Sequence, residues 1–126
     1  MTIRTVGVIG AGQMGTGIAQ VFAQAGYEVT LNDISGERLE QAAAAIRKGL
    51  DRQVAKGRMA EGDRDATLAR IATTTDLPSL GPLDLIVESA TEKEEVKQKI
   101  FADLAPHLGP QTRLTTNTSS ISITRL

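Results

Sequence analysis

The chain has 126 residues, and its 14 lysines and arginines nearly balance its 15 aspartates and glutamates, giving a formal net charge of -1 at pH 7. This balance provides no basic surface for a nucleic acid or an anionic membrane, and no segment is long and apolar enough to span a bilayer. Cysteine is absent, which excludes disulfides, thiolate zinc sites and a cysteine nucleophile and fits the reducing cytoplasm. We therefore expect one globular, cytoplasmic domain whose partners are neither nucleic acids nor membranes.

The first 33 residues predict the order strand, tight turn, helix, strand. Residues Thr5 to Ile9 form a short apolar run, as in strands that are buried on both faces. A glycine-rich turn follows, and apolar residues then recur on one face at helical spacing, as in an amphipathic helix. These residues are Met14, Ile18, Val21, Phe22 and Ala25. Gly26 ends the helix, and a strand over residues 28–31 leads into Asn32 and Asp33.

A long helix comes next in the sequence. Ser35 is a candidate cap at its start, and Lys56 and Gly57 end it. Its apolar residues recur every three or four positions: Leu39, Ala43, Ile46, Leu50 and Val54. This spacing predicts a second amphipathic helix on the same sheet.

The second half of the chain continues the alternation of helices and strands. We expect a short polar helix over residues 61–69, a short strand over 70–74, a strand over 83–88, a helix over 94–108 and a last strand over 113–116. This order predicts a single α/β domain, with a doubly wound, mostly parallel sheet and helices on both faces. The chain ends at Leu126, where Ser120 or Ser122 would cap a new helix, so we expect a C-terminally truncated domain.

The turn after the first strand has the sequence G-A-G-Q-M-G. Gly10 permits the tight turn, Gly12 lets the backbone approach a pyrophosphate, and Gly15 lets the helix pack closely on the strand. The helix that begins near Gln13 presents unpaired N–H groups and the positive end of its dipole to the phosphates. The sequence therefore predicts the dinucleotide-binding loop of a Rossmann-type fold. Its expected cofactor-binding residues are Gly10, Ala11, Gly12, Gln13, Met14 and Gly15.

An acidic residue completes this pattern at the end of the second strand. Asp33 follows the glycines at the spacing at which a carboxylate accepts hydrogen bonds from the hydroxyls of the adenosine ribose. The carboxylate also repels a 2′-phosphate, so the sequence favours NAD over NADP, although the nearby Arg38 could weaken that preference. The alternative is a glycine-rich turn of no function with Asp33 as a helix cap, but the strand, the helix and the acidic residue together favour the cofactor site.

A polar run, N-T-S-S, follows the last predicted strand at residues 117–120. In doubly wound sheets, ligands bind beyond the carboxyl ends of the strands, where the strand order reverses. Asn117 and Ser119 are therefore expected near the nicotinamide end of the cofactor, where amide and hydroxyl groups can orient a substrate oxygen. The residues alone leave open the alternative that this run is only a turn and a helix cap.

Four segments resemble the L-3-hydroxyacyl-CoA dehydrogenase family, and within it the bacterial 3-hydroxybutyryl-CoA dehydrogenases. They are V-G-V-I-G-A-G-Q-M-G-T-G-I-A-Q at residues 6–20, L-N-D-I at 31–34, I-V-E-S-A-T-E at 86–92 and N-T-S-S-I-S-I-T at 117–124. The glycine loop occurs in many dehydrogenases, whereas the N-T-S-S-x-S-I-T run at this distance from it is much more specific. The resemblance extends over essentially the whole chain.

The resemblance implies roles for further residues of this sequence. It places Glu92 and Lys97 along the NAD site, whereas the residues alone favour an exposed charge pair at the start of a helix. It implies that Ser119 hydrogen-bonds the reacting 3-oxygen of the substrate, with Asn117 beside it. It also implies that Lys56 approaches the phosphates of coenzyme A. We expect no metal site.

The resemblance further implies an enzymatic activity, the reversible oxidation of a 3-hydroxyacyl-CoA such as 3-hydroxybutyryl-CoA to a 3-ketoacyl-CoA, in fatty-acid metabolism. NAD accepts the hydride, a histidine beyond the N-T-S-S run acts as general base, and a glutamate orients that histidine. In the family a helical C-terminal domain closes the substrate site and forms a homodimer. The single histidine of this sequence, His107, precedes the last predicted strand, and we interpret it as a surface residue. We therefore expect residues 1–126 to bind NAD without turnover.

Two alternatives share the same glycine loop and acidic residue. One is a related hydroxyacid or sugar-acid dehydrogenase, such as the L-gulonate type. The other is a non-enzymatic module that senses the ratio of NAD to NADH. The residues that follow Leu126 would discriminate between these alternatives.

Overall fold

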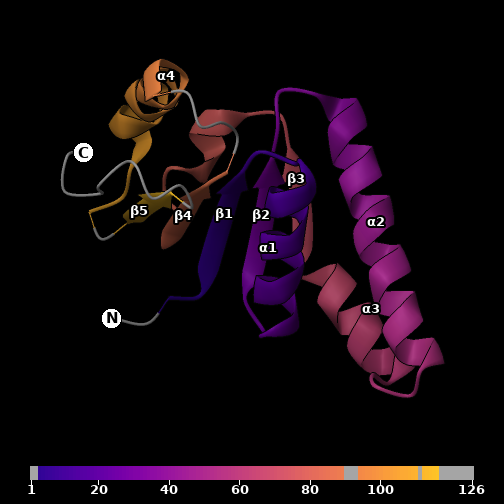
Figure 1. The fold of residues 1–126 in the computed structure, drawn as a ribbon. Coiled ribbons are helices and arrows are strands. Elements are labelled where there is room, and N and C mark those ends of the chain that lie inside the picture. The colour runs from indigo at the N-terminus through magenta and orange to yellow at the C-terminus, as the bar shows by residue number, and fades with distance from the viewer. Residues whose placement is uncertain (1–2, 90–93, 111, 117–126) are drawn as a thin grey trace.

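In the computed structural model, residues 3–89, 94–110 and 112–116 are described, and their strands form one five-stranded sheet. The strands are β1 (Thr5–Ile9), β2 (Glu28–Asn32), β3 (Ile71–Thr74), β4 (Leu85–Glu88) and β5 (Arg113–Thr116). Their spatial order is β3-β2-β1-β4-β5, and each neighbouring pair is parallel (Figure 1). The predicted Rossmann-type parallel sheet is therefore confirmed.

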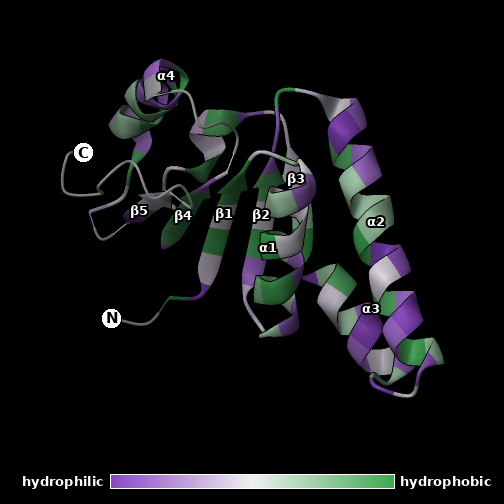
Figure 2. Ribbon diagram, in the orientation of Figure 1, coloured by the Kyte–Doolittle hydropathy of each residue, from purple (hydrophilic) through white to green (hydrophobic). Residues whose placement is uncertain are grey.

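Helices cover both faces of this sheet. The α-helices in the described residues are α1 (Gln13–Gln24), α2 (Gly36–Ala55), α3 (Glu61–Ala69) and α4 (Glu94–Leu104), with short 3-10 helices η1 (Leu77–Leu80) and η2 (Ala105–His107). Helices α1, α2 and α3 lie together beside β1, β2 and β3, whereas α4 lies at the β4–β5 end (Figure 1). Figure 2 shows largely apolar central strands between helices that carry alternating polar and apolar residues.

The core has two parts because successive side chains of a strand point to opposite faces. On one face, Val6 and Val8 of β1 pack in a cluster with residues of α1 and α2, including Ala19 and Ile46. On the other face, Ile9 belongs to a second cluster, together with Ile86, Leu114, Leu80, Phe101 and Leu104. Helix α4 and η1 supply the covering residues of this second cluster, so the sheet is enclosed by two layers.

Local signals in the sequence correctly locate several element ends. Ser35 caps α2, since its Oγ accepts a hydrogen bond from the backbone N–H of Arg38 at 3.2 Å. Helix α3 and strand β5 have the predicted bounds. The predicted helix over residues 94–108 is divided, because α4 ends at Leu104 and a 3-10 turn with Pro106 follows it.

The predicted apolar face of α1 is only partly buried, since Ile18 and Phe22 pack against the core and the rest of that face does not. The residues of α1 that are buried against the sheet are Gly15, Ala19 and Ala23, whereas Met14 and Val21 are 60% and 67% exposed. The predicted apolar residues and the buried small residues both recur every three to four positions, so periodicity alone does not distinguish the two sets. Small side chains let α1 approach the strands closely, and the larger apolar side chains are left on its flank. In α2, Leu39, Ile46 and Leu50 are buried as predicted, but the buried alanine is Ala42, and the predicted Ala43 is exposed.

The register of the strands brings several carboxyl ends to one level. Ile9 at the end of β1 pairs with Asn32 of β2 and with Glu88 of β4. The chain proceeds from β1 to β2 and β3 in one direction and resumes with β4 on the other side of β1. The strand order therefore reverses between β1 and β4, which is where such sheets form a ligand crevice.

The described part of the chain contains neither a helix suited to a membrane nor a group of side chains suited to a metal ion. None of its helices has the length and apolarity needed to cross a bilayer. Its His, Asp and Glu side chains form no group of three that could hold a metal ion.

Candidate functional site

A cleft of about 460 Å³ lies at the carboxyl ends of the strands. The glycine loop after β1 supplies Gly10 and Gly12, and the turn after β2 supplies Asp33 and Ile34. Arg38 of α2 and Ser89, the residue after β4, complete this side of the cleft. The cleft therefore occupies the position predicted by the reversal of strand order.

The glycine loop has the backbone geometry that the motif predicts. Gly10 adopts a φ of 103°, a conformation that favours glycine, and its N–H donates to the carbonyl of Asn32 at 2.7 Å. A Cβ on Gly15 would collide with the carbonyl oxygen of Gly10 and would approach Ser89 Oγ to 2.7 Å, so helix and loop are in direct contact. A Cβ on Gly12, in contrast, would enter open space, so the loop backbone faces the cleft there without a side chain.

The first turn of α1 is suited to an anion. Its N-cap residue is Gly12, which has no side chain to cap the helix, and the turn contains no acidic residue. The positive end of the helix dipole and the N–H groups of the first turn are therefore not neutralised by a carboxylate of their own helix. A phosphate is the ligand that such a helix start binds in dinucleotide-binding folds.

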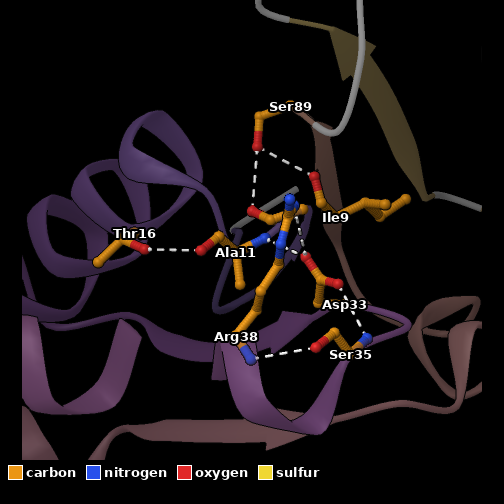
Figure 3. Close-up of polar contacts among 8 residues, drawn as sticks. Ile9, Ala11, Thr16, Asp33, Ser35, Arg38 and Ser89 are labelled. Carbon is orange, nitrogen blue, oxygen red and sulfur yellow. Dashed lines mark hydrogen bonds and ion pairs between the residues drawn. The ribbon is translucent and has the colours of Figure 1, made fainter. Parts of the chain in front are cut away.

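Asp33 is held rigidly beside the glycine loop. Its Oδ2 accepts a hydrogen bond from the N–H of Ala11 at 2.9 Å, and its Oδ1 accepts one from the N–H of Ser35 at 2.9 Å (Figure 3). The residue is only 7% exposed. These bonds fix the carboxylate in the cleft wall, and each of its oxygens can still accept a further hydrogen bond from a ligand.

Ser89 joins β4 to the glycine loop, a role that the sequence did not reveal. Its Oγ donates to the carbonyl oxygens of Ile9 at 3.0 Å and of Gly10 at 3.3 Å, and its N–H donates to Ile9 at 2.8 Å (Figure 3). The hydroxyl therefore fixes the start of the loop from the neighbouring strand. Its place directly after a predicted strand, level with the glycines, is the signal that could have identified it.

Helix α4 forms a second wall that was also missed. Val96, Lys99, Ile100 and Asp103 line the cleft from α4, and Leu77 lines it from η1. Lys99 and Asp103 are exposed and lie one helical turn apart, so this wall presents both a positive and a negative charge. No local motif marks these residues, because only the packing of α4 on the sheet brings them to the cleft.

Behind this wall, Glu88 and Lys97 form a buried ion pair. Lys97 Nζ lies 3.0 Å from Glu88 Oε1, and both side chains are fully buried. The pair connects the end of β4 to α4, which carries the second wall. Lys97 is therefore not an exposed charge, as the residues alone had suggested, and Glu88 was not among the predicted site residues.

Only some of the predicted site residues lie at the cleft. Gly10, Gly12 and Asp33 line the cleft, and Ala11 and Gln13 line the adjacent groove between α1 and α2. Gly15 packs against Gly10 from inside the helix, and Met14 is exposed on the flank of α1, away from the cleft. Lys56 is exposed at the end of α2, about 30 Å along the helix axis from Gly36. Glu92, Asn117 and Ser119 lie outside the described residues.

His107 is an exposed residue of η2, as the sequence analysis predicted. Its backbone carbonyl lies near Gly81, which precedes β4 in the chain. His107 is not among the residues that line the cleft.

The family of the chain follows from comparison with known proteins. Residues 5–126 match the family model "3-hydroxyacyl-CoA dehydrogenase, NAD binding domain". The 3-hydroxybutyryl-CoA dehydrogenase of Bradyrhizobium diazoefficiens is 51% identical over 98% of this chain and 42% of that protein. The 3-hydroxyadipyl-CoA dehydrogenase of Escherichia coli is 46% identical over 100% of this chain and 26% of its own length.

A solved structure gives the same relationship. The crystal structure of the 3-hydroxybutyryl-CoA dehydrogenase from Escherichia coli K12 superposes with a TM-score of 0.93 at 47% identity, over 98% of this chain and 26% of that one. The chain thus spans less than half the length of these relatives. Together with the glycine loop and Asp33, these matches show that the chain belongs to the NAD-binding domain family of the 3-hydroxyacyl-CoA dehydrogenases.

Proposed function

We propose that this domain holds NAD for the interconversion of a 3-hydroxyacyl-CoA, such as 3-hydroxybutyryl-CoA, and the corresponding 3-ketoacyl-CoA. The observation that carries the proposal is the hydrogen bond from the Ala11 N–H to Asp33 Oδ2 at 2.9 Å. It places a fixed carboxylate directly beside a glycine loop that faces the cleft. Phosphate and ribose recognition are thereby adjacent, as an adenosine diphosphate moiety requires.

The residues present in the cleft fit the cofactor. Gly12 leaves open space at the start of α1, and the uncapped first turn provides N–H donors for the pyrophosphate. The Asp33 carboxylate accepts hydrogen bonds from the ribose hydroxyls. When bound, NAD supplies the hydride acceptor of the reaction, and the protein supplies binding and orientation.

We assign the substrate side of the reaction to the residues that the family resemblance indicates. Ser119 and Asn117 hold the 3-oxygen of the substrate, and Glu92 stands beside the nicotinamide half of NAD. Lys97, for which the resemblance implies the same place, is fully buried against Glu88 and supports this half of the site through α4. Lys56 contacts the phosphates of coenzyme A. Its position at the far end of α2 requires the CoA moiety to extend along this helix.

In the relatives' longer chains, the part beyond this domain is proposed to supply the general base and the dimer interface. The single histidine of the present chain is exposed and does not line the cleft, so we assign the base to another residue. Residues 1–126 are therefore proposed to bind NAD without turning over substrate. We assign the activity to fatty-acid metabolism in the cytoplasm.

Binding and turnover of the purified protein test this proposal separately. Titration with NADH, followed by nucleotide fluorescence, is expected to show saturable binding. Oxidation of NADH with acetoacetyl-CoA is expected to stay at the rate without protein. Absence of NADH binding would contradict the proposed function, and turnover at the rate of a complete dehydrogenase would contradict the assignment of the base to another part of the enzyme.

A further inference from the structure

The guanidinium of Arg38 lies beside the carboxylate that anchors the ribose in the proposed function. Arg38 is in the first turn of α2, where its backbone N–H donates to Ser35 Oγ at 3.2 Å. Its side chain runs alongside Asp33 toward the glycine loop (Figure 3). Its Nη1 lies 4.0 Å from Asp33 Oδ2. The cap at Ser35 therefore fixes the backbone from which the Arg38 side chain extends.

The two charged groups differ in how firmly they are held. The side chain of Asp33 is 7% exposed and accepts two backbone hydrogen bonds, whereas the side chain of Arg38 is 65% exposed. Arg38 lines both the cofactor cleft and the adjacent groove between α1 and α2 that contains Gln13 and Thr16. The carboxylate is thus a fixed group, and the guanidinium is an exposed cation at the mouth of the same subsite.

We infer that Arg38 is a second determinant of cofactor specificity, which attracts a 2′-phosphate and thereby limits the discrimination that Asp33 imposes against NADP. This inference rests on the proposed function, in which Asp33 holds the adenosine ribose. A phosphate on the 2′-oxygen would approach both groups, and an arginine donates several N–H groups to a phosphate. The paired charges sum to zero, so the subsite repels a phosphate less than the carboxylate alone.

The net charge of residues 33 and 38 predicts how the ratio of NADPH affinity to NADH affinity ranks in the original protein, two single variants and the double variant. Arg38→Gln leaves the carboxylate alone and is expected to give the lowest ratio of NADPH to NADH affinity. Asp33→Asn leaves the guanidinium alone and is expected to give the highest ratio. The original protein and the double variant, both locally neutral, are expected to fall between them. Asparagine keeps the shape of the aspartate and one acceptor oxygen for the loop N–H.

The test is fluorescence titration of these four proteins with NADH and with NADPH at low ionic strength. Arg38→Gln is expected to weaken NADPH binding about fivefold and NADH binding less than about twofold, as fits an exposed charge contact. Arg47→Gln is the matched control, since Arg47 is exposed on the opposite face of α2, about 13 Å along the axis. It removes the same charge and is expected to change neither affinity. Added salt is expected to reduce the effect of Arg38→Gln.

The possible results separate this inference from the function on which it rests. If the original protein binds no NADH, the proposed function and this inference both fail. If it binds NADH but Arg38→Gln weakens both nucleotides equally, the arginine acts on the adenine or on the fold, and the inference alone is overturned. An equal effect of Arg47→Gln would overturn it as well, because overall charge would then suffice.

Discussion

Gly15 is the residue at which helix α1 touches the loop that precedes it. A Cβ at this position would overlap the carbonyl oxygen of Gly10, which belongs to the rigid turn after β1. This nearest obstruction is a backbone atom, so it cannot be relieved by the rotation of a side chain such as that of Ser89. The close contact of helix and loop therefore depends on the absence of one methyl group.

Gly15→Ala is expected to displace α1 from the glycine loop, because the added methyl group cannot be accommodated. We expect a loss of about 1–3 kcal/mol in the free energy of unfolding, measured by urea denaturation, together with weaker NADH binding. Gly17→Ala is the control, since Gly17 is exposed in the same helix and a Cβ there meets no atom. It is expected to stabilise the protein by up to about 1 kcal/mol. Equal stability of the two variants would contradict this description of the loop.

The residues that sequence reasoning identified are those with a local physical requirement. Gly10 needs a positive φ, Gly15 needs close approach, and Asp33 stands at a fixed distance along the chain. Ser89 has only its place directly after a predicted strand as a signal, and Asp103 has none. Their roles arise from contacts between segments that are distant in sequence.

At the scale of elements, the buried pair of Glu88 and Lys97 connects strand β4 to helix α4. Two fully buried charges at 3.0 Å are stable together, but the removal of one partner leaves a charge in an apolar environment. The pair therefore holds the α4 wall of the cleft in register with the end of β4.

Lys97→Met is expected to lower the free energy of unfolding by about 3 kcal/mol, because it leaves the Glu88 carboxylate without its partner. The double variant Lys97→Met with Glu88→Gln is expected to recover part of this loss, as chemical denaturation of the single and double variants would show. Lys99→Met, on the exposed face of the same helix, is expected to change the stability by less than about 0.5 kcal/mol. Additive losses for the two single changes would exclude coupling between the buried charges.

A second connection between elements lies at the amino ends of β1 and β4, away from the cleft. Asp84 Oδ2 accepts hydrogen bonds from the backbone N–H groups of Arg4 at 2.8 Å and Thr5 at 3.1 Å, and Thr5 Oγ1 accepts one from the Asp84 N–H at 2.9 Å. These backbone donors hold the pKa of the Asp84 carboxyl below its usual value. The ionised carboxylate therefore joins the start of β1 to the residue before β4.

The lowered pKa of Asp84 predicts how stability depends on pH. A carboxyl whose pKa is lower in the folded state contributes stability above its unfolded pKa, about 3.9, and loses it as the pH falls through the folded value. Asp84→Asn is thus expected to destabilise the protein near neutral pH, with a difference that shrinks in acid. Urea denaturation over this pH range measures it, with Glu40→Gln on the surface of α2 as the control. A difference independent of pH would assign the effect to packing instead of charge.

Helix α1 also shows what a periodic pattern cannot decide. The prediction of a helix after the glycine loop is correct, but Met14 and Val21 of the predicted apolar face are exposed. Two neighbouring rows share the same period, one of glycine and alanine and one of larger apolar side chains. Only the close approach of the helix to the sheet, which Gly15 and Ala19 permit, selects the row of small residues.

At the scale of the whole molecule, the alternation of strands and helices suffices to predict the parallel sheet. Because each crossover is right-handed, the reversal of the strand order beside β1 is what places helices on both faces. The cleft is a consequence of this topology, since the glycine loop, the turn after β2 and the residue after β4 all meet at that edge. The second wall on α4 is not predicted by topology alone, because it depends on how far α4 is tilted toward the strand ends.

The central claim is that NAD lies across the carboxyl ends of β1 and β2, with its pyrophosphate at the start of α1 and its ribose on Asp33. Titration of the ¹⁵N-labelled protein with NAD, followed through the backbone amide signals, tests this most directly. The largest shifts are expected at Ala11, Gly12 and Gln13 and in the turn around Asp33, with little change near Asp84 at the opposite edge of the sheet. Shifts confined to that opposite edge, or the same shifts in Asp33→Ala at the same NAD affinity, would contradict the assigned site.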